Sequence, residues 1–135
     1  MTEKKAMKWE ILIIDESEQW NDGLADLLEE TYPQSVLCQA FSKEQAIELA
    51  NERTFHLIVL DPFIPASVDG RYVVEKLRQF YSINKDTPIV VFTEDIDYVS
   101  DLTTEFEIHP ETKLGPLEKV LNPISMNLKK HKDAA

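Results

Sequence analysis

Cysteine, glycine and long apolar runs are all scarce in this sequence. A single cysteine, Cys38, excludes a disulfide within the chain, and its apolar neighbours favour a buried structural thiol. The three glycines, at positions 23, 70 and 115, do not suffice for a phosphate-binding loop or a dinucleotide-binding fingerprint. The uninterrupted apolar runs span four residues, too few for a signal-peptide core or a membrane span. We therefore expect a cytoplasmic protein.

Basic residues are also in the minority. The chain has 14 Lys and Arg against 25 Asp and Glu, which gives a net charge of −11. Because so acidic a body repels phosphate backbones and anionic lipids, we expect neither nucleic-acid nor membrane binding. Only the two ends are locally basic, and we interpret residues 1–8 as an extension and residues 129–135 as a tail. With 43% hydrophobic and 29% charged residues overall, residues 9–128 suit one globular domain.

Three apolar runs predict strands buried on both faces, the pattern typical of a parallel sheet. These runs are residues 11–14, 57–60 and 89–92. Residues 36–41 are a less apolar fourth candidate, and residues 106–109 are a weak fifth one. The sequence thus predicts up to five strands.

Helical patterns lie between these strands. We expect helices over residues 20–32, after a capping box at Ser42, over residues 72–81, near residues 99–106, and from Pro116 to Leu128 with a kink at Pro123. Strands that alternate with helices predict an α/β fold, a doubly wound and mostly parallel sheet. In such sheets ligands bind beyond the carboxyl ends of the strands.

Polar side chains with complementary chemistry follow the predicted strands. Asp15 and Glu16 follow the first strand, Asp61 the third, Thr93 the fourth, and Lys113 lies near the fifth. Three converging carboxylates repel one another, which predicts a site for a hard cation such as Mg²⁺. Asp61 is then a candidate nucleophile toward phosphorus, with Thr93 and Lys113 placed to bind phosphoryl oxygens.

Each of these residues also has an ordinary explanation. Because 25 of the 135 residues are acidic, about one strand end in five bears a carboxylate by chance. Thr93 alone is more often a helix cap, and Lys113 alone is more often a solvated lysine. Only the joint placement favours a functional site.

The same positions resemble the receiver domain of bacterial two-component response regulators. The resemblance covers residues 9–128: Asp15-Glu16 match the family's metal-binding acids, and residues 56–61 match its third strand ending in the phosphorylated aspartate. Pro65 and Asp69-Gly70 match the segment that follows that aspartate. Residues 87–93 match the fourth strand ending in the switch hydroxyl, and Thr112-Lys113 match the approach to the family lysine.

The resemblance implies both a fold and a function. The fold is a CheY-like, flavodoxin-like five-stranded parallel sheet in the order 2-1-3-4-5. The function is Mg²⁺-dependent phosphorylation of Asp61 by a sensor histidine kinase or a phosphotransfer protein. Asp15, Glu16 and Asp61 are the implied metal ligands, and Thr93 and Lys113 complete the site. Such a domain is a signalling phosphoacceptor and not an enzyme, apart from assisting its own phosphorylation and dephosphorylation.

The sequence also departs from the family pattern. Leu114 and Gly115 follow Lys113 where the family has a cis-proline, and Pro110 stands where it has an aromatic switch residue. Glu94 replaces a small residue, which predicts slow phosphorylation. Phe63, two residues after Asp61, is placed to shield an acyl phosphate, which predicts a long-lived phosphorylated state.

Several alternatives remain open. The main one is a phosphorylation-independent pseudo-receiver that acts as a protein interaction module, favoured by Glu94, Pro110 and the residues after Lys113. A haloacid-dehalogenase-type phosphatase is disfavoured because Phe63 occupies the place of its second aspartate. A flavodoxin-like binder of small molecules lacks the aromatic, hydroxyl-rich loops that it needs.

The output of the domain is a downstream protein partner that the sequence does not identify. By analogy with the family, the surface of this chain that binds the partner covers residues 97–128. Only seven residues follow Leu128, so we expect no attached output domain, and we expect either a stand-alone receiver or one excised from a longer protein.

Overall fold

The computed structural model describes residues 8–63 and 67–134, in which strands alternate with helices. The strands are β1 (Glu10–Ile14), β2 (Val36–Ala40), β3 (Leu57–Leu60), β4 (Ile89–Thr93) and β5 (His109–Thr112). The α-helices are α1 (Glu18–Thr31), α2 (Lys43–Glu52), α3 (Ser67–Leu77), α4 (Ser100–Glu105) and α5 (Leu121–Ala134). Two 3₁₀ segments, η1 (Asp97–Val99) and η2 (Leu117–Val120), precede α4 and α5.

The strands form one parallel sheet in the order β2-β1-β3-β4-β5, which confirms the doubly wound, flavodoxin-like fold. The apolar residues of β1, β3 and β4 are buried at its centre. The edge strands β2 and β5 are only partly buried, which explains their weaker apolar patterns. Cys38 on β2 is accordingly half-buried and not fully buried as its neighbours suggested. Strand order reverses between β1 and β3, where ligands bind in sheets of this kind.

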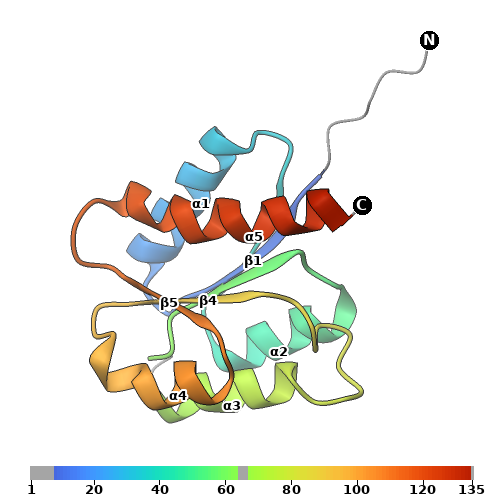
Figure 1. The fold of residues 1–135 in the computed structure, drawn as a ribbon, viewed down its shortest axis with the longest axis vertical. Coiled ribbons are helices and arrows are strands. Elements are labelled where there is room, and N and C mark those ends of the chain that lie inside the picture. The colour runs from blue at the N-terminus through green and yellow to red at the C-terminus, as the bar shows by residue number, and fades with distance from the viewer. Residues whose placement is uncertain (1–7, 64–66, 135) are drawn as a thin grey trace.

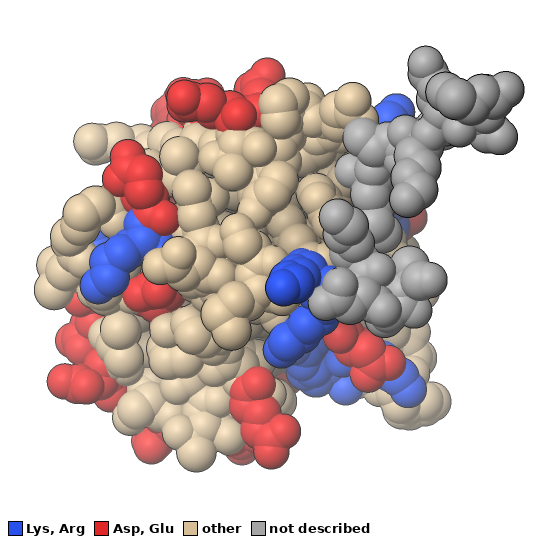
Figure 2. All heavy atoms as spheres, turned by 45° about the horizontal axis from the view of Figure 1, so that its top comes forward, with Lys and Arg blue, Asp and Glu red and all other residues tan. Residues whose placement is uncertain are grey.

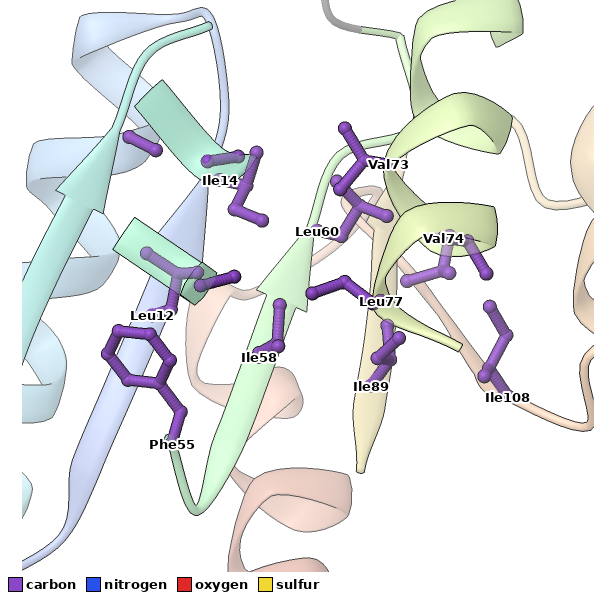
Figure 3. Packing of buried hydrophobic residues seen from close by; sticks show 14 of the residues in the cluster. Leu12, Ile14, Phe55, Ile58, Leu60, Val73, Val74, Leu77, Ile89 and Ile108 are labelled. Carbon is purple, nitrogen blue, oxygen red and sulfur yellow. The ribbon is translucent and has the colours of Figure 1, made fainter. Parts of the chain in front are cut away.

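Each face of the sheet has its own hydrophobic core. Helices α1 and α5 cover one face, and α2, α3 and α4 cover the other (Figure 1). Alternation along β1 sends Ile11 and Ile13 into the α1/α5 core, and Leu12 and Ile14 into the other. In Figure 3, Leu12 and Ile14 lie on the same side of the sheet as the apolar side chains of β3 and α3. Both faces of the sheet are thus covered by helices, so a functional site is expected at the ends of the strands.

Serine caps set the starts of the first two helices. Ser17 Oγ accepts a hydrogen bond from the Trp20 amide at 3.3 Å, at the start of α1. Ser42 Oγ accepts one from the Gln45 amide at 3.2 Å, as the sequence predicts, and the Gln45 side chain accepts one from the Phe41 amide. Both helices therefore begin directly beyond the carboxyl end of the preceding strand.

The fifth strand lies three residues later than the sequence indicates. The prediction of residues 106–109 is wrong because Phe106 ends α4 and Glu107 adopts a left-handed conformation with φ 53°. The strand instead begins at His109 and contains Pro110, which pairs in register with Val91. An edge strand tolerates a proline because its outer side needs no ladder hydrogen bond.

The third helix ends earlier than predicted. It stops at Leu77, and Phe80 and Tyr81 are 87% and 65% exposed, so they do not belong to its buried face. The segment after the helix is held by the Arg78 guanidinium, which donates a hydrogen bond to the carbonyl oxygen of Asn84 at 3.3 Å. This contact ties the end of α3 to the loop before β4.

Pro123 does not kink the last helix. The chain first forms η2 and then begins α5 at Leu121, so Pro123 lies in the first turn of α5. The N–H that proline lacks would have no partner within the helix at that position. The residues that we interpreted as a basic tail continue α5 as far as Ala134.

Charge is unevenly placed on the surface. Figure 2 shows Asp and Glu side chains scattered around the margin of one face. Most of the Lys and Arg side chains in this view lie toward the right, and others lie at the left edge. No helix in the described part of the chain is long and apolar enough to cross a membrane.

Candidate functional site

Four of the predicted site residues lie at the carboxyl ends of the strands. Asp15, Asp61 and Lys113 directly follow β1, β3 and β5, and Thr93 is the last residue of β4. Backbone hydrogen bonds extend the sheet to these positions, from Asp61 N to Ile14 O at 2.8 Å and from Lys113 N to Thr93 O at 2.7 Å. The fold thereby holds their backbones in fixed register.

One ammonium group joins two of the carboxylates. Lys113 Nζ lies 2.7 Å from Asp15 Oδ2 and 3.0 Å from Asp61 Oδ2. The side chains of Lys113, Asp15 and Asp61 are only 2%, 6% and 15% exposed. Because the ion pairs lie away from water, they are screened much less than a surface pair.

The second oxygen of each carboxylate is bound to the backbone. Asp15 Oδ1 accepts a hydrogen bond from the Ser17 amide at 2.9 Å, and Asp61 Oδ1 accepts one from the Phe63 amide at 3.0 Å. Each aspartate thus has one oxygen fixed by the main chain and one oxygen facing the lysine.

Burial and neighbouring charges perturb Asp15. The pKa of Asp15 is raised, chiefly because burial disfavours the charged carboxylate, and the Asp61 carboxylate raises it further. The hydrogen bond and charge of Lys113 and the Ser17 amide act in the opposite direction. Burial therefore favours the protonated form of Asp15, whereas Lys113 favours its carboxylate.

The hydroxyl of Thr93 is buried beside the following loop. Thr93 Oγ1 accepts a hydrogen bond from the Asp95 amide at 3.1 Å, and Asp95 Oδ1 accepts one from the Tyr98 amide at 3.0 Å in η1. Thr93 is thus connected through Asp95 to η1, which precedes α4. Glu94 is exposed.

Lys113 reaches the site although no proline directly follows it. Its ammonium lies over two aromatic rings, 4.8 Å from the Trp20 centroid and 5.7 Å from the Phe92 centroid. Sequence reasoning placed Trp20 only in the apolar stripe of a helix and missed this contact. The available signal was that Trp20 stands five residues after Asp15, in the first turn of a helix that starts at the same sheet edge.

A divalent cation fits two of the three predicted ligands. Asp15 and Asp61 already share one cationic group, whereas Glu16 is exposed. Within residues 8–63 and 67–134, no three His, Cys, Asp or Glu side chains gather closely enough to hold a metal ion. Two carboxylates with water as the remaining ligand match the usual coordination of Mg²⁺.

The sequence analysis singled out other positions that follow Asp61. Pro65 is outside the described residues. Gly70 in α3 faces the backbone of Pro62, because a Cβ there would lie 2.2 Å from the Pro62 carbonyl oxygen. Phe63 packs against Tyr98 of η1 with a centroid distance of 5.4 Å, which places an aromatic pair beside Asp61.

Comparisons with known proteins identify a family and a fold. A family model described as the response regulator receiver domain matches residues 11–107. A CheY-like response regulator receiver domain protein from Methanospirillum hungatei has a TM-score of 0.81 at 16% identity, over 96% of this chain and 100% of that one. No curated protein sequence gives a significant match.

Two other solved structures have the same fold. A signal receiver domain of a two-component histidine kinase from Clostridium thermocellum has a TM-score of 0.78 at 17% identity, over 91% of this chain and 99% of that one. The response regulator TrrA from Thermotoga maritima, solved in complex with Mg²⁺-BeF, has a TM-score of 0.76 at 23% identity, over 90% of this chain and 100% of that one.

Proposed function

This chain belongs to the response regulator receiver domain family, and from that premise we propose that Asp61 accepts a phosphoryl group. The donor is a phosphohistidine of a sensor histidine kinase or phosphotransfer protein in the cytoplasm. A carboxylate oxygen of Asp61 forms the new bond to phosphorus, while the donor's phosphorus–nitrogen bond breaks and the imidazole nitrogen keeps the electron pair.

The placement of Asp61 carries this proposal. Its carboxylate is mostly buried at the switch point of the sheet, with Oδ1 held by the Phe63 amide and Oδ2 facing Lys113. A nucleophile held by the main chain needs little reorganisation to attack. Both oxygens are therefore held, Oδ1 by the Phe63 amide and Oδ2 by the Lys113 ammonium, which fixes the orientation of the carboxylate.

Asp15 and Asp61 are the residues that would hold Mg²⁺. When bound, the ion supplies positive charge against the phosphoryl oxygens as negative charge gathers there. Glu16, the third expected ligand, is exposed beside them.

Lys113 and Thr93 position and neutralise the transferred group. The Lys113 ammonium changes partners, from the carboxylates to a phosphoryl oxygen. The Thr93 hydroxyl donates a hydrogen bond to another phosphoryl oxygen, and its contact with the Asp95 amide changes as the loop shifts. This shift biases the surface over residues 97–128 toward binding a downstream protein.

The experiment is an intact-mass measurement after incubation with a small-molecule phosphodonor, with and without Mg²⁺. Wild type should gain one phosphoryl group only with Mg²⁺, and Asp61→Asn should gain none. Asp86→Asn, which changes an exposed acid, serves as the matched control and should label like wild type. An adduct that persists in Asp61→Asn contradicts the assignment of the acceptor.

A phosphorylation-independent interaction module is the second candidate. It is favoured by residues that depart from the family pattern, since Leu114 and Gly115 follow Lys113 where the family has a cis-proline. Pro110 in β5 also replaces the aromatic residue on which switching usually depends. A folded wild-type protein that takes no phosphoryl group, beside a control receiver that is labelled, supports this candidate.

A further inference from the structure

The Lys113 ammonium has two kinds of neighbour, carboxylates and aromatic rings. The rings of Trp20 and Phe92 are perpendicular, with centroids 5.7 Å apart, and the ammonium lies within 6 Å of both centroids. Trp20 lies in the first turn of α1, and Phe92 is a buried residue of β4. Two elements far apart in sequence thus form one aromatic cage for a single cation.

The cage is placed for a cation–π interaction away from water. The negative face of an aromatic ring attracts a cation within about 6 Å of its centroid, most strongly for tryptophan and in desolvated positions. Lys113 is 2% exposed, so the contact is almost fully desolvated. The side chain of Leu114, the next residue, is exposed and adds no packing around the ammonium.

The carboxylates and the rings behave differently during phosphoryl transfer. Asp15 and Asp61 both acquire new partners in the proposed reaction, so the ammonium loses the groups that hold it. The rings take part in no bond that forms or breaks. They are therefore the neighbours of Lys113 that persist through the exchange.

We propose that Trp20, supported by Phe92, is a positioning residue that holds the Lys113 ammonium at the site while its partners change from carboxylates to a phosphoryl oxygen. This inference rests on the proposed phosphoryl transfer to Asp61. Trp20 acts through Lys113 and does not touch the transferred group.

The contact itself is tested in metal-free protein by NMR. The ring currents of Trp20 and Phe92 should shift the Lys113 ε-methylene protons upfield of their position in an unstructured lysine. Trp20→Leu should move these resonances downfield, and Trp20→Phe should retain most of the shift. Trp9→Phe is the matched control, since Trp9 packs with His56 and His131, and it should leave the resonances unchanged. If the Lys113 ε-methylene resonances do not move in Trp20→Leu, the proposal is overturned.

The positioning role is tested by the rate of labelling with the phosphodonor. Trp20→Leu should slow labelling about five- to thirty-fold, which corresponds to about 1–2 kcal/mol, and Trp20→Phe should recover most of the rate. In a Lys113→Met background, Trp20→Leu should cause no further loss, because the residue it positions is gone.

A Trp20 that only packs the helix gives another pattern. It would slow labelling equally in the wild-type and Lys113→Met backgrounds, and that result overturns the inference. If wild type is labelled and Trp20→Leu is labelled as fast, the inference alone fails. If wild type takes no phosphoryl group although the ring-current shift is present, both the proposed function and the positioning role that rests on it fail.

Discussion

Replacing Lys113 with methionine tests the balance of charge at the site. The substitution keeps the bulk of the side chain and removes the cation that Asp15 and Asp61 share at 2.7 and 3.0 Å. Two carboxylates then remain close together, and the side chain of Asp15 is only 6% exposed. We expect Lys113→Met to fold and to be less stable.

The size of the loss follows from burial. Removing one partner of a buried ion pair costs about 3–5 kcal/mol, because the other charge stays buried without compensation. Asp61 is 15% exposed and can turn toward water, so we expect about 3 kcal/mol, the lower end of that range. With a urea m-value of about 1.5 kcal/mol/M, the midpoint falls by about 2 M.

The loss should depend on pH. Burial raises the pKa of Asp15 above its unfolded value, so folding favours the protonated form and stability increases as the pH falls through the raised pKa. Lys113 lowers that pKa, so its removal enlarges the rise. The deficit of Lys113→Met is therefore largest at pH 7 and shrinks toward pH 5.

Urea denaturation at both pH values measures this. Lys119→Met, which changes an exposed lysine of η2, is the matched control and should stay within about 0.5 kcal/mol of wild type. Asp15→Asn combined with Lys113→Met should recover much of the loss, because it removes one unpaired charge. A deficit under about 1 kcal/mol at pH 7, or one that grows toward pH 5, refutes the reasoning.

Three further predictions concern single positions. Gly70→Ala should lower the free energy of unfolding by several kcal/mol or prevent folding, because a Cβ there meets the backbone of Pro62 at 2.2 Å. Gly23→Ala, in open space within α1, should instead stabilise the protein by about 0.5–1 kcal/mol. Thermal melts compare the two variants. Phe63→Ala should lose its phosphoryl group faster than wild type in a mass time course, and equal rates contradict a shielding role. Burial and the charge of His131 lower the pKa of His56, so folding favours neutral His56 and stability is lost as the pH falls through the folded pKa. His56→Gln should therefore lose less stability than wild type between pH 7 and pH 5.

Much of the fold was predictable because strands buried on both faces are continuous apolar runs in the sequence. The runs 11–14, 57–60 and 89–92 mark the three central strands almost to the residue, since both faces of those strands are covered. The edges were harder to predict. A half-exposed strand such as β5 accepts a proline and carries little apolar signal, so its start was misplaced by three residues. After α3, Arg78 contacts Asn84 six positions away, and no local pattern of apolar residues records such a contact.

The sequence by itself determined which residue types follow each central strand, because strand ends can be read from apolar runs, and so it indicated Asp15, Asp61 and Thr93. Only the tertiary structure decided how they combine. Lys113 reaches both aspartates and lies over Trp20, while Glu16 stays exposed. These relations join residues up to 98 positions apart, and they depend on crossovers and packing angles that no local pattern specifies.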